Sequence, residues 1–223
     1  MHKYILFLLS LFISSFEVKG QSIALTQHNL TPVQVMMKPV ELNGKKAIRV
    51  TKDPAVTKDD EATFARINDL SFRDGTIEVN VLSRLLPDAP AHARGFIGVA
   101  FRVSEKNERF ECIYIRPTNG RAEQQLRRNR SVQYFSYPDF KYDRLRKESA
   151  GEYESYADMG LNEWIRLRIE IKGTRAKLFI NNQAYPSLIV NDLKLGENNS
   201  GAIGLFVDIG TEGFFADLTI KNQ

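Results

Sequence analysis

The clearest structural pattern in the sequence is Trp164-Ile165-Arg166-Leu167-Arg168-Ile169-Glu170-Ile171-Lys172, in which apolar and charged residues alternate without a break. Successive side chains of a β-strand point to opposite faces, so a period of two is typical of a strand with one buried face. A helix would repeat its apolar residues every three or four positions. The stretch therefore predicts a strand that buries its branched aliphatic side chains and turns its arginine and glutamate side chains to the other face.

Short runs with the same period recur along the chain and are separated by turn residues. Asn43-Gly44 lies between two of them and suits the left-handed dihedral angles of a tight hairpin turn. Helical periodicity is weak, and only residues 122–129 are compatible with a short helix. This pattern predicts an all-β fold, a single jelly-roll domain made of two antiparallel sheets. The other predicted strands are residues 40–42, 46–50, 76–81, 96–103, 110–116, 176–181, 202–209 and 214–220.

The N-terminal residues have the layout of an export signal. A basic start, Met1-His2-Lys3, precedes an apolar run over residues 4–13 that is too short to span a bilayer. Val18 and Gly20 supply small residues before a cleavage site at Gln21. We therefore expect a signal peptide at residues 1–20, a single mature domain at residues 21–223, and a periplasmic or secreted protein that does not insert into a membrane after cleavage.

Cysteine and histidine are too scarce for several kinds of site. Cys112 is the only cysteine, so no intramolecular disulfide can form. One of the three histidines, His2, lies in the signal, which leaves little material for a histidine-rich metal site or a Ser-His-Asp triad. We expect no cofactor and no metal ligands. Calcium bound by loop oxygens is compatible with such folds, but no ligand spacing indicates it.

Two hairpins carry a resemblance to a known superfamily. Residues 164–173 and 176–182 resemble the W-x-x-x-x-I-x-x-x-G hairpin of concanavalin A-like lectin/glucanase domains, and residues 201–206 and 214–220 resemble their closing strands. Glu78, followed by a glycine-rich strand that ends at Arg102, is similar to the bacterial exported 3-keto-disaccharide hydrolase and laminin-G-like domains. The resemblance covers residues 62–220 and implies a concanavalin A-like jelly roll with a saccharide or polysaccharide as ligand.

The sequence departs from that superfamily at two points. Asn181-Asn182 stands where a hairpin Asn-Gly is usual, and asparagine also accepts a left-handed conformation. The E-x-D-x-x-E strand of laminarinase-type glycosidases is absent, so the resemblance does not imply their retaining mechanism. Lectins, hydrolases, lyases and adhesion modules share this scaffold, and the fold alone does not choose among them.

A basic and aromatic insertion at about residues 117–160 is the most unusual segment. Residues 121–148 contain eight Lys and Arg against four Asp and Glu. Three interpretations remain open. The segment is a solvated crossover pinned by its aromatic residues, or a ligand surface where aromatic rings stack on sugars and arginines hold an acidic group, or a nucleic-acid surface. We do not expect nucleic acid to be the partner, because an exported protein rarely meets it.

The candidate site residues follow from strand faces and from the insertion. Arg102 and Arg116 each close a predicted strand on the face opposite the aliphatic side chains, and Tyr114 shares that face with Arg116. The chain then passes from Arg116 directly into the insertion. They are predicted to frame one saccharide pocket with residues of the insertion: Asn119, Arg121, Arg128, Tyr134 and Tyr137. The glycines at 98 and 204 are expected to allow close ligand approach, although bulges explain them nearly as well.

Two classes of function are compatible with these residues. The first is an exported carbohydrate-active domain that binds, and in the enzymatic version hydrolyses, a saccharide. Its acid and base groups would be carboxylates, with Glu78, Asp208 and Glu148 as the candidates. A polysaccharide lyase would instead use Tyr114 or Tyr137 beside Arg116. The second class is a non-catalytic carbohydrate-binding or adhesion module that uses the same surface. The sequence does not define the oligomeric state.

Overall fold

The computed structural model describes residues 20–222 of the chain. The predicted signal segment, apart from Gly20, lies outside the described residues. No helix within the described part is long and apolar enough to cross a membrane.

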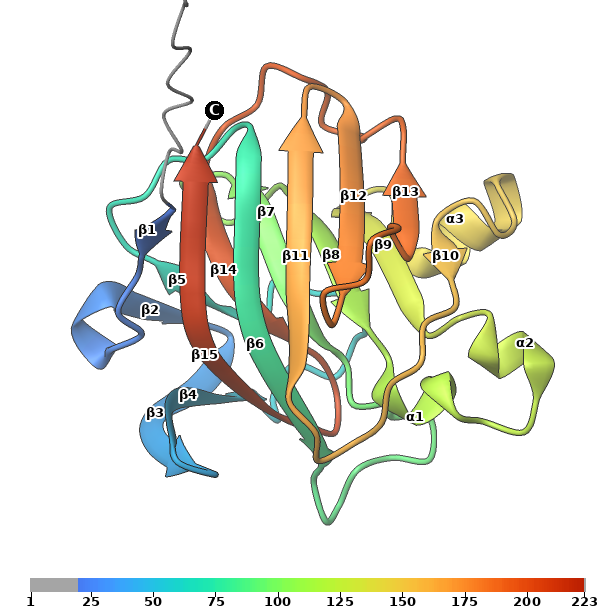
Figure 1. Cartoon of the computed structure of the whole chain (residues 1–223), viewed down its shortest axis with the longest axis horizontal. Helices are drawn as coiled ribbons and strands as arrows, with labels where there is room; N and C mark the ends of the chain where they lie inside the picture. Colours follow the sequence, from blue (N-terminus) through green and yellow to red (C-terminus); the bar gives the residue numbers. More distant parts are fainter. Residues whose placement is uncertain (1–19, 223) are drawn as a thin grey trace, which may run out of the picture.

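The domain consists of two antiparallel β-sheets packed face to face (Figure 1). The eight-stranded sheet has the order β13 (Leu188–Val190), β12 (Arg175–Ile180), β11 (Ile165–Lys172), β6 (Gly75–Leu85), β15 (Thr211–Asn222), β4 (Lys45–Lys52) and β3 (Val35–Leu42), and β1 (Gln21–Ser22) also pairs with β15. The seven-stranded sheet has the order β10 (Glu154–Ser155), β9 (Val132–Tyr137), β8 (Phe110–Ile115), β7 (Ile97–Val103), β14 (Ala202–Val207), β5 (Phe64–Ile67) and β2 (Leu30–Val33). The predicted all-β fold of two antiparallel sheets is confirmed.

Strand β11 shows how the alternating pattern builds the core. Its four aliphatic side chains, at positions 165, 167, 169 and 171, are at most 1% exposed. Burying each such side chain contributes about 1.5–3 kcal/mol. The turn between β3 and β4 is also as predicted, because Asn43 and Gly44 have φ angles of 52° and 73°, the values that a tight hairpin requires.

The outer face of the seven-stranded sheet is filled by the protein's own aromatic side chains. These residues are at most 1% exposed and alternate with the core-facing residues of their strands: Phe64, Phe110, Tyr114, Phe135 and Phe206. Loop 53–63 and the segment after β9 cover them. Glu61 joins the two covers, since it accepts hydrogen bonds from the Tyr137 hydroxyl at 3.0 Å and from Lys141 at 2.5 Å.

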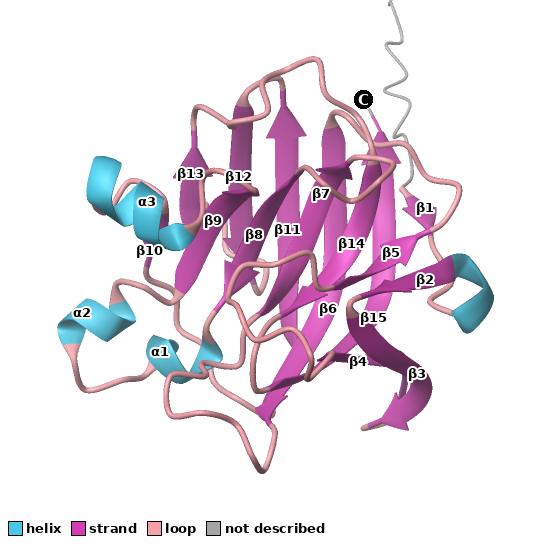
Figure 2. Ribbon diagram, turned by 180° about the vertical axis from the view of Figure 1, so that it is seen from behind, coloured by secondary structure: helices cyan, strands magenta, loops and turns pink. Residues whose placement is uncertain are grey.

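The basic segment at residues 117–160, predicted as an insertion, forms part of the seven-stranded sheet. It contains β9, which pairs with β8 over its whole length, and β10, which pairs with β9. Its remaining residues form three short helices, α1 (Pro117–Gly120), α2 (Gln125–Arg128) and α3 (Tyr142–Glu148). These helices lie beside β8, β9 and β10 (Figure 2). A 3₁₀ turn, η1 (Gln27–Asn29), precedes β2.

Candidate functional site

A cavity of about 240 Å³ opens at one end of the aromatic face, where β8 and β14 end and β7 begins. Four segments contribute to it: loop 53–63, the loop before β7, the segment from the end of β8 through α2 to β9, and helix α3. Its walls are strongly polar around a few aromatic rings. The lining residues are Asp59, Asp60, His92, Arg94, Phe96, Tyr114, Arg116, Asn119, Arg127, Arg130, Tyr142, Arg146 and Asp208.

Arg116 forms the floor of the cavity and is only 5% exposed. Its Nη2 donates to the Tyr114 hydroxyl at 2.7 Å and to Gln133 Oε1 at 2.5 Å. Its Nη1 donates to Glu154 at 3.0 Å and to the carbonyl of Arg130 at 3.3 Å. Because both terminal nitrogens already have partners inside the protein, Arg116 ties β8 to β9 and β10 rather than offering an open fork to a ligand.

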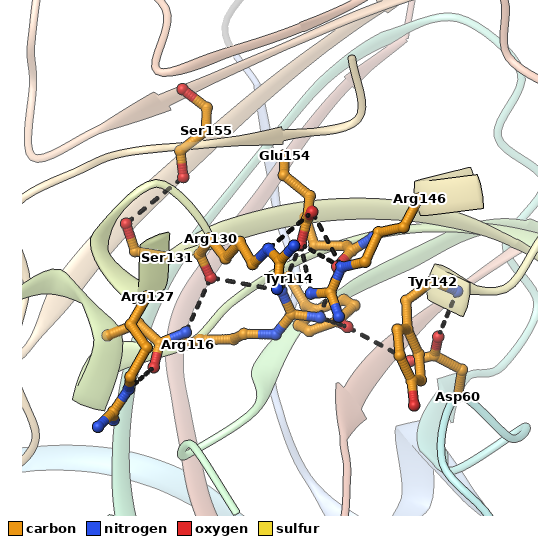
Figure 3. A network of polar contacts seen from close by, with 12 residues as sticks. Asp60, Tyr114, Arg116, Arg127, Arg130, Ser131, Tyr142, Arg146, Glu154 and Ser155 are labelled. Carbon is orange, nitrogen blue, oxygen red and sulfur yellow. Dashed lines mark hydrogen bonds and ion pairs between the residues drawn. The ribbon is translucent and has the colours of Figure 1, made fainter. Parts of the chain in front are cut away.

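Glu154 of β10 is the carboxylate at the centre of the arginine cluster (Figure 3). Besides Arg116, it pairs with Arg146 at 2.5 Å and with Arg130 at 3.5 Å. Its side chain is 6% exposed, and the arginine hydrogen bonds and charges lower its pKa despite burial, which acts in the opposite direction. One carboxylate therefore serves three guanidinium groups, and the cluster keeps a surplus of positive charge.

The acidic end of the cavity is formed by Asp60 and Asp208. Asp60 accepts a hydrogen bond from the backbone N–H of Tyr142 at 3.0 Å, and its own N–H donates to Asp208 at 2.8 Å. Lys52 pairs with Asp208 at 2.5 Å, and both side chains are at most 5% exposed. Burial, and then the charge of Asp208, raise the pKa of Asp60 from 3.8 to about 7. Asp60 can therefore act as a hydrogen-bond donor or as an acceptor near neutral pH.

Aromatic rings supply the apolar part of the cavity. Tyr114 and Phe96 meet edge to face, with ring centroids 6.0 Å apart. The ring of Tyr142, at the start of α3, lies 4.9 Å from the guanidinium carbon of Arg146. Tyr114 is held at its hydroxyl by Arg116, and burial raises its pKa well above 10. Tyr114 therefore remains a neutral phenol, which makes it a poor base for the lyase hypothesis.

Four of the residues predicted from the sequence line this cavity: Tyr114, Arg116, Asn119 and Asp208. The Asn119 amide donates to the Arg130 carbonyl at 3.0 Å, and its oxygen accepts from Arg127 at 3.3 Å. Asp208 is held by Lys52, so its carboxylate is not free to act as a nucleophile. The structure does not bring the other predicted residues into the cavity.

Arg102 lies elsewhere because of a β-bulge. The pairing of β7 with β14 shifts register between Ala202 and Gly204, and Arg102 adopts a positive φ of 52°. A bulge re-aims the side chain, so strict alternation no longer assigns its face. The guanidinium is buried among the turns at one end of the sandwich and donates to Asp74 and to three backbone carbonyls. It holds the fold together and does not face the cavity.

The other residues that the insertion was predicted to contribute also have partners elsewhere. Arg121 is exposed and pairs with Asp158 and Glu163. Arg128 lies over Tyr156, 5.1 Å from the ring. Tyr134 faces the core side of β9 and donates to Glu111 at 2.5 Å. Tyr137 stacks on Phe110 and is bonded to Glu61.

Two of the predicted catalytic carboxylates are ion-paired on the surface. Glu78 pairs with Arg166 on the outer face of the eight-stranded sheet, the sheet opposite the cavity. Glu148 pairs with Arg144 across one turn of α3, and both side chains are at least 43% exposed. Neither lies in the cavity, so the predicted catalytic set is not assembled.

The two glycines expected to admit a ligand instead make room for the protein's own side chains. A Cβ atom at Gly98 would lie 2.3 Å from the carbonyl oxygen of Ile113, and one at Gly204 would lie 2.7 Å from the ring of Phe64. Both glycines therefore allow the close packing of the aromatic face, and the space beside them is filled by the protein's own atoms and not left for a ligand.

Several lining residues were not selected from the sequence: Asp59, Asp60, His92, Arg94, Arg127, Arg130, Tyr142 and Arg146. Only the basic composition of residues 121–148 pointed towards three of the arginines. Among residues 20–222, no group of three or more His, Cys, Asp or Glu side chains is arranged to hold a metal ion.

Comparisons with known proteins define the class of fold. No family model and no curated protein matches the chain. The carbohydrate-binding module CBM66 from Bacillus subtilis has a similar structure, with a TM-score of 0.53 and 14% sequence identity over 86% of this chain and 97% of the module. A candidate glycosyl hydrolase from Parabacteroides distasonis gives 0.51 and 13% over 87% and 99%. A second one from that organism gives 0.51 and 11% over 89% and 90%.

These similarities support the two-sheet β-sandwich fold of the chain. At such low identity they show the fold alone. The relation to 3-keto-disaccharide hydrolases stays a prediction from the sequence.

Proposed function

We propose that this protein is a carbohydrate-binding domain that holds one sugar unit of an acidic saccharide in the cavity at the end of the aromatic face. The observation that carries the proposal is the composition of that cavity, in which aromatic rings stand beside buried, hydrogen-bonding arginine and aspartate side chains. Aromatic rings pack on the apolar faces of sugars, and charged groups orient the hydroxyls. The shared fold with a carbohydrate-binding module supports the same function.

The size of the cavity limits what it can hold. Pockets for drug-sized ligands span about 300–1,000 Å³, and this one has about 240 Å³. A single sugar ring therefore fits better than an enclosed oligosaccharide, and further units of a chain would extend into solvent.

Replacing Tyr142 with alanine tests the location of the site. The backbone N–H that donates to Asp60 remains in this variant, while the ring that forms one wall is lost. We expect affinity for the best ligand of a glycan array to fall about tenfold or more, equivalent to ~1.4 kcal/mol, in isothermal titration calorimetry. Tyr185→Ala is the matched control, because Tyr185 is 84% exposed and does not line the cavity. Equal affinity of the two variants would place binding elsewhere, and the absence of any glycan ligand would contradict the proposed function.

Hydrolysis is a second candidate, favoured by Asp60. Its raised pKa of about 7 is appropriate for a general acid that protonates a glycosidic oxygen. Asp59 lines the same cavity and is a second carboxylate that could activate water. If the domain is an enzyme, product analysis on the bound glycan should show cleavage by the natural protein and none by Asp60→Asn. An intact glycan with both proteins would leave the non-catalytic binding module as the function.

A further inference from the structure

The charges of the cavity are separated into two ends. Five arginines line it, and Glu154 is the ion-pair partner of three of them. The other two arginines, Arg94 and Arg127, line the cavity outside this Glu154 cluster. Asp60 of loop 53–63 lies on the other side, and Asp59 of the same loop approaches His92 at 3.8 Å. In Figure 3, Arg127 and Asp60 lie on opposite sides of Tyr114 and Arg116.

Arg94 makes hydrogen bonds but has no ion pair within residues 20–222. Its Nη1 donates to the carbonyls of Ala91 at 2.8 Å and Ala93 at 2.7 Å, which fixes the loop before β7. Its remaining guanidinium N–H groups have no hydrogen-bond acceptor in this part of the chain. Burial, and then the positive charges of Arg127 and Arg116, lower the pKa of Arg94. A negative charge at this place would relieve that repulsion.

Arg127 is in a similar situation at the C-terminal end of α2. Its Nε donates to the side-chain oxygen of Asn119 at 3.3 Å, a neutral acceptor. Within the described chain no carboxylate pairs with it. Arg121, by contrast, has two carboxylate partners and Arg144 has one. The two cavity arginines without an acidic partner are therefore the natural binding site for an anionic group of a ligand, since guanidinium forks match a carboxylate with two parallel hydrogen bonds.

The acidic end selects against a ligand that is negative throughout. Asp59 is partly exposed, and Asp60 is an acid with a neighbouring carboxylate, Asp208. Sugar hydroxyls can donate to these oxygens, whereas a second anionic group would meet like charges. A saccharide ligand that carries one anionic group at one end and hydroxyl groups at the other is a sugar acid.

We propose that the sugar unit bound in the cavity is a uronic acid, with its carboxylate held by Arg94 and Arg127 and its hydroxyls directed to Asp59 and Asp60. This inference rests on the proposed saccharide binding and specifies the ligand class. It also differs from the site predicted by the sequence, because neither of these arginines was among the residues selected there.

The test compares matched sugars and matched variants. Calorimetric titrations with galacturonate and glucuronate oligosaccharides are set against galactose and glucose oligosaccharides of the same linkage and length, and against a sulfated galactan. We expect at least one uronate to bind tenfold or more tightly than its neutral counterpart and than the sulfated chain. Affinity for the uronate should decline only modestly with added salt, because Arg94 and Arg127 are half-buried and partly buried charge pairs are screened less than exposed ones.

The variants Arg94→Gln and Arg127→Gln should each weaken uronate binding at least tenfold and leave the weak binding of neutral sugars within about twofold. Arg144→Gln is the charge-matched control, because this exposed arginine pairs with Glu148 outside the cavity, and its affinity should equal that of the natural protein. Thermal melts show whether each variant is folded. Arg127→Gln remains decisive if Arg94→Gln unfolds, since Arg127 has fewer bonds to lose.

Two sets of outcomes separate this inference from the proposed function. Neutral or sulfated sugars that bind as tightly as uronates, or tight uronate binding that survives in Arg127→Gln, would overturn the uronate assignment while saccharide binding stands. Failure of every saccharide to bind would overturn both.

Discussion

Replacing Arg102 with alanine should destabilise the protein by about 3–5 kcal/mol, the cost of removing one partner from a buried ion pair. The Arg102 side chain is fully buried and donates to the carbonyls of Arg73, Gly173 and Gly196 at 2.7–3.0 Å and to Asp74 at 3.1 Å. Alanine would leave three carbonyls and a carboxylate without that donor. In a domain of this size each kcal/mol lowers the melting temperature by about 2–4 °C, so calorimetry should record a drop of about 10 °C.

Arg73→Ala is the control for that measurement. Arg73 approaches the same carboxylate, that of Asp74, at 3.5 Å, but its side chain is 59% exposed. Surface substitutions of this kind usually change stability by less than about 0.5 kcal/mol. Similar melting temperatures for Arg102→Ala and the natural protein would contradict the tethering role and return Arg102 to the set of candidate ligand contacts.

The fold could be predicted because strands of the eight-stranded sheet such as β11 bury one face and leave the other polar, and because strands β7 and β14 repeat aliphatic residues on their core side. In β11 the aliphatic and charged residues alternate for eight positions, and the pairing with β6 and β12 follows that register. Strand β9 was missed because its core-facing positions do not repeat aliphatic residues. Five of its six residues are buried, because its outer face packs under the loop that carries Glu61. Strands β7, β8 and β14 are also buried on both faces, but aliphatic residues repeat on their core side, whereas the core side of β9 carries Val132, Tyr134 and Ser136.

The site could be predicted only in part. Tyr114 and Arg116 were found because β8 keeps its register up to its last residue. Arg102 was assigned to the wrong place because the bulge in β7 depends on pairing with β14, a strand about one hundred residues away in the sequence. Helix α2 has only four residues, too few to show from periodicity whether Arg127 or Arg128 faces the cavity.

Asp60 illustrates a residue that no local pattern could have revealed. It lies in a polar loop, next to Asp59 and Glu61, where solvent exposure is the normal expectation. Its burial arises only because the loop folds over the aromatic face and places Asp60 between the backbone of Tyr142 and Asp208. These contacts join α3 and the end of β14 to loop 53–63, so the environment of Asp60 is a product of the tertiary fold.

Replacing Asp60 with asparagine should make the protein more stable at pH 8.5 by several kcal/mol and change stability little near pH 4. The pKa of Asp60 is raised to about 7 in the folded state from an ordinary value of 3.8. Between these two values the folded state holds a proton that the unfolded chain has lost, so the natural protein loses stability as pH rises through this window. A shift of about three pKa units corresponds to a loss on the order of 4 kcal/mol. Asparagine is neutral at every pH and avoids that loss.

Denaturant unfolding of both proteins at pH 4, 6 and 8.5 measures this difference. The titratable groups near Asp60 are the Asp208 and Asp59 carboxylates, the Arg116 guanidinium, the phenols of Tyr114 and Tyr142, and the buried thiol of Cys112. Glu111 and Asp208 also have raised pKa values because of burial, so both proteins should lose some stability at high pH. Since these groups are present in both proteins, most of their contribution cancels in the difference between the two curves. A difference that stays constant from pH 4 to 8.5 would mean that folding does not raise the pKa of Asp60, because the nearby Arg116 offsets burial and Asp208.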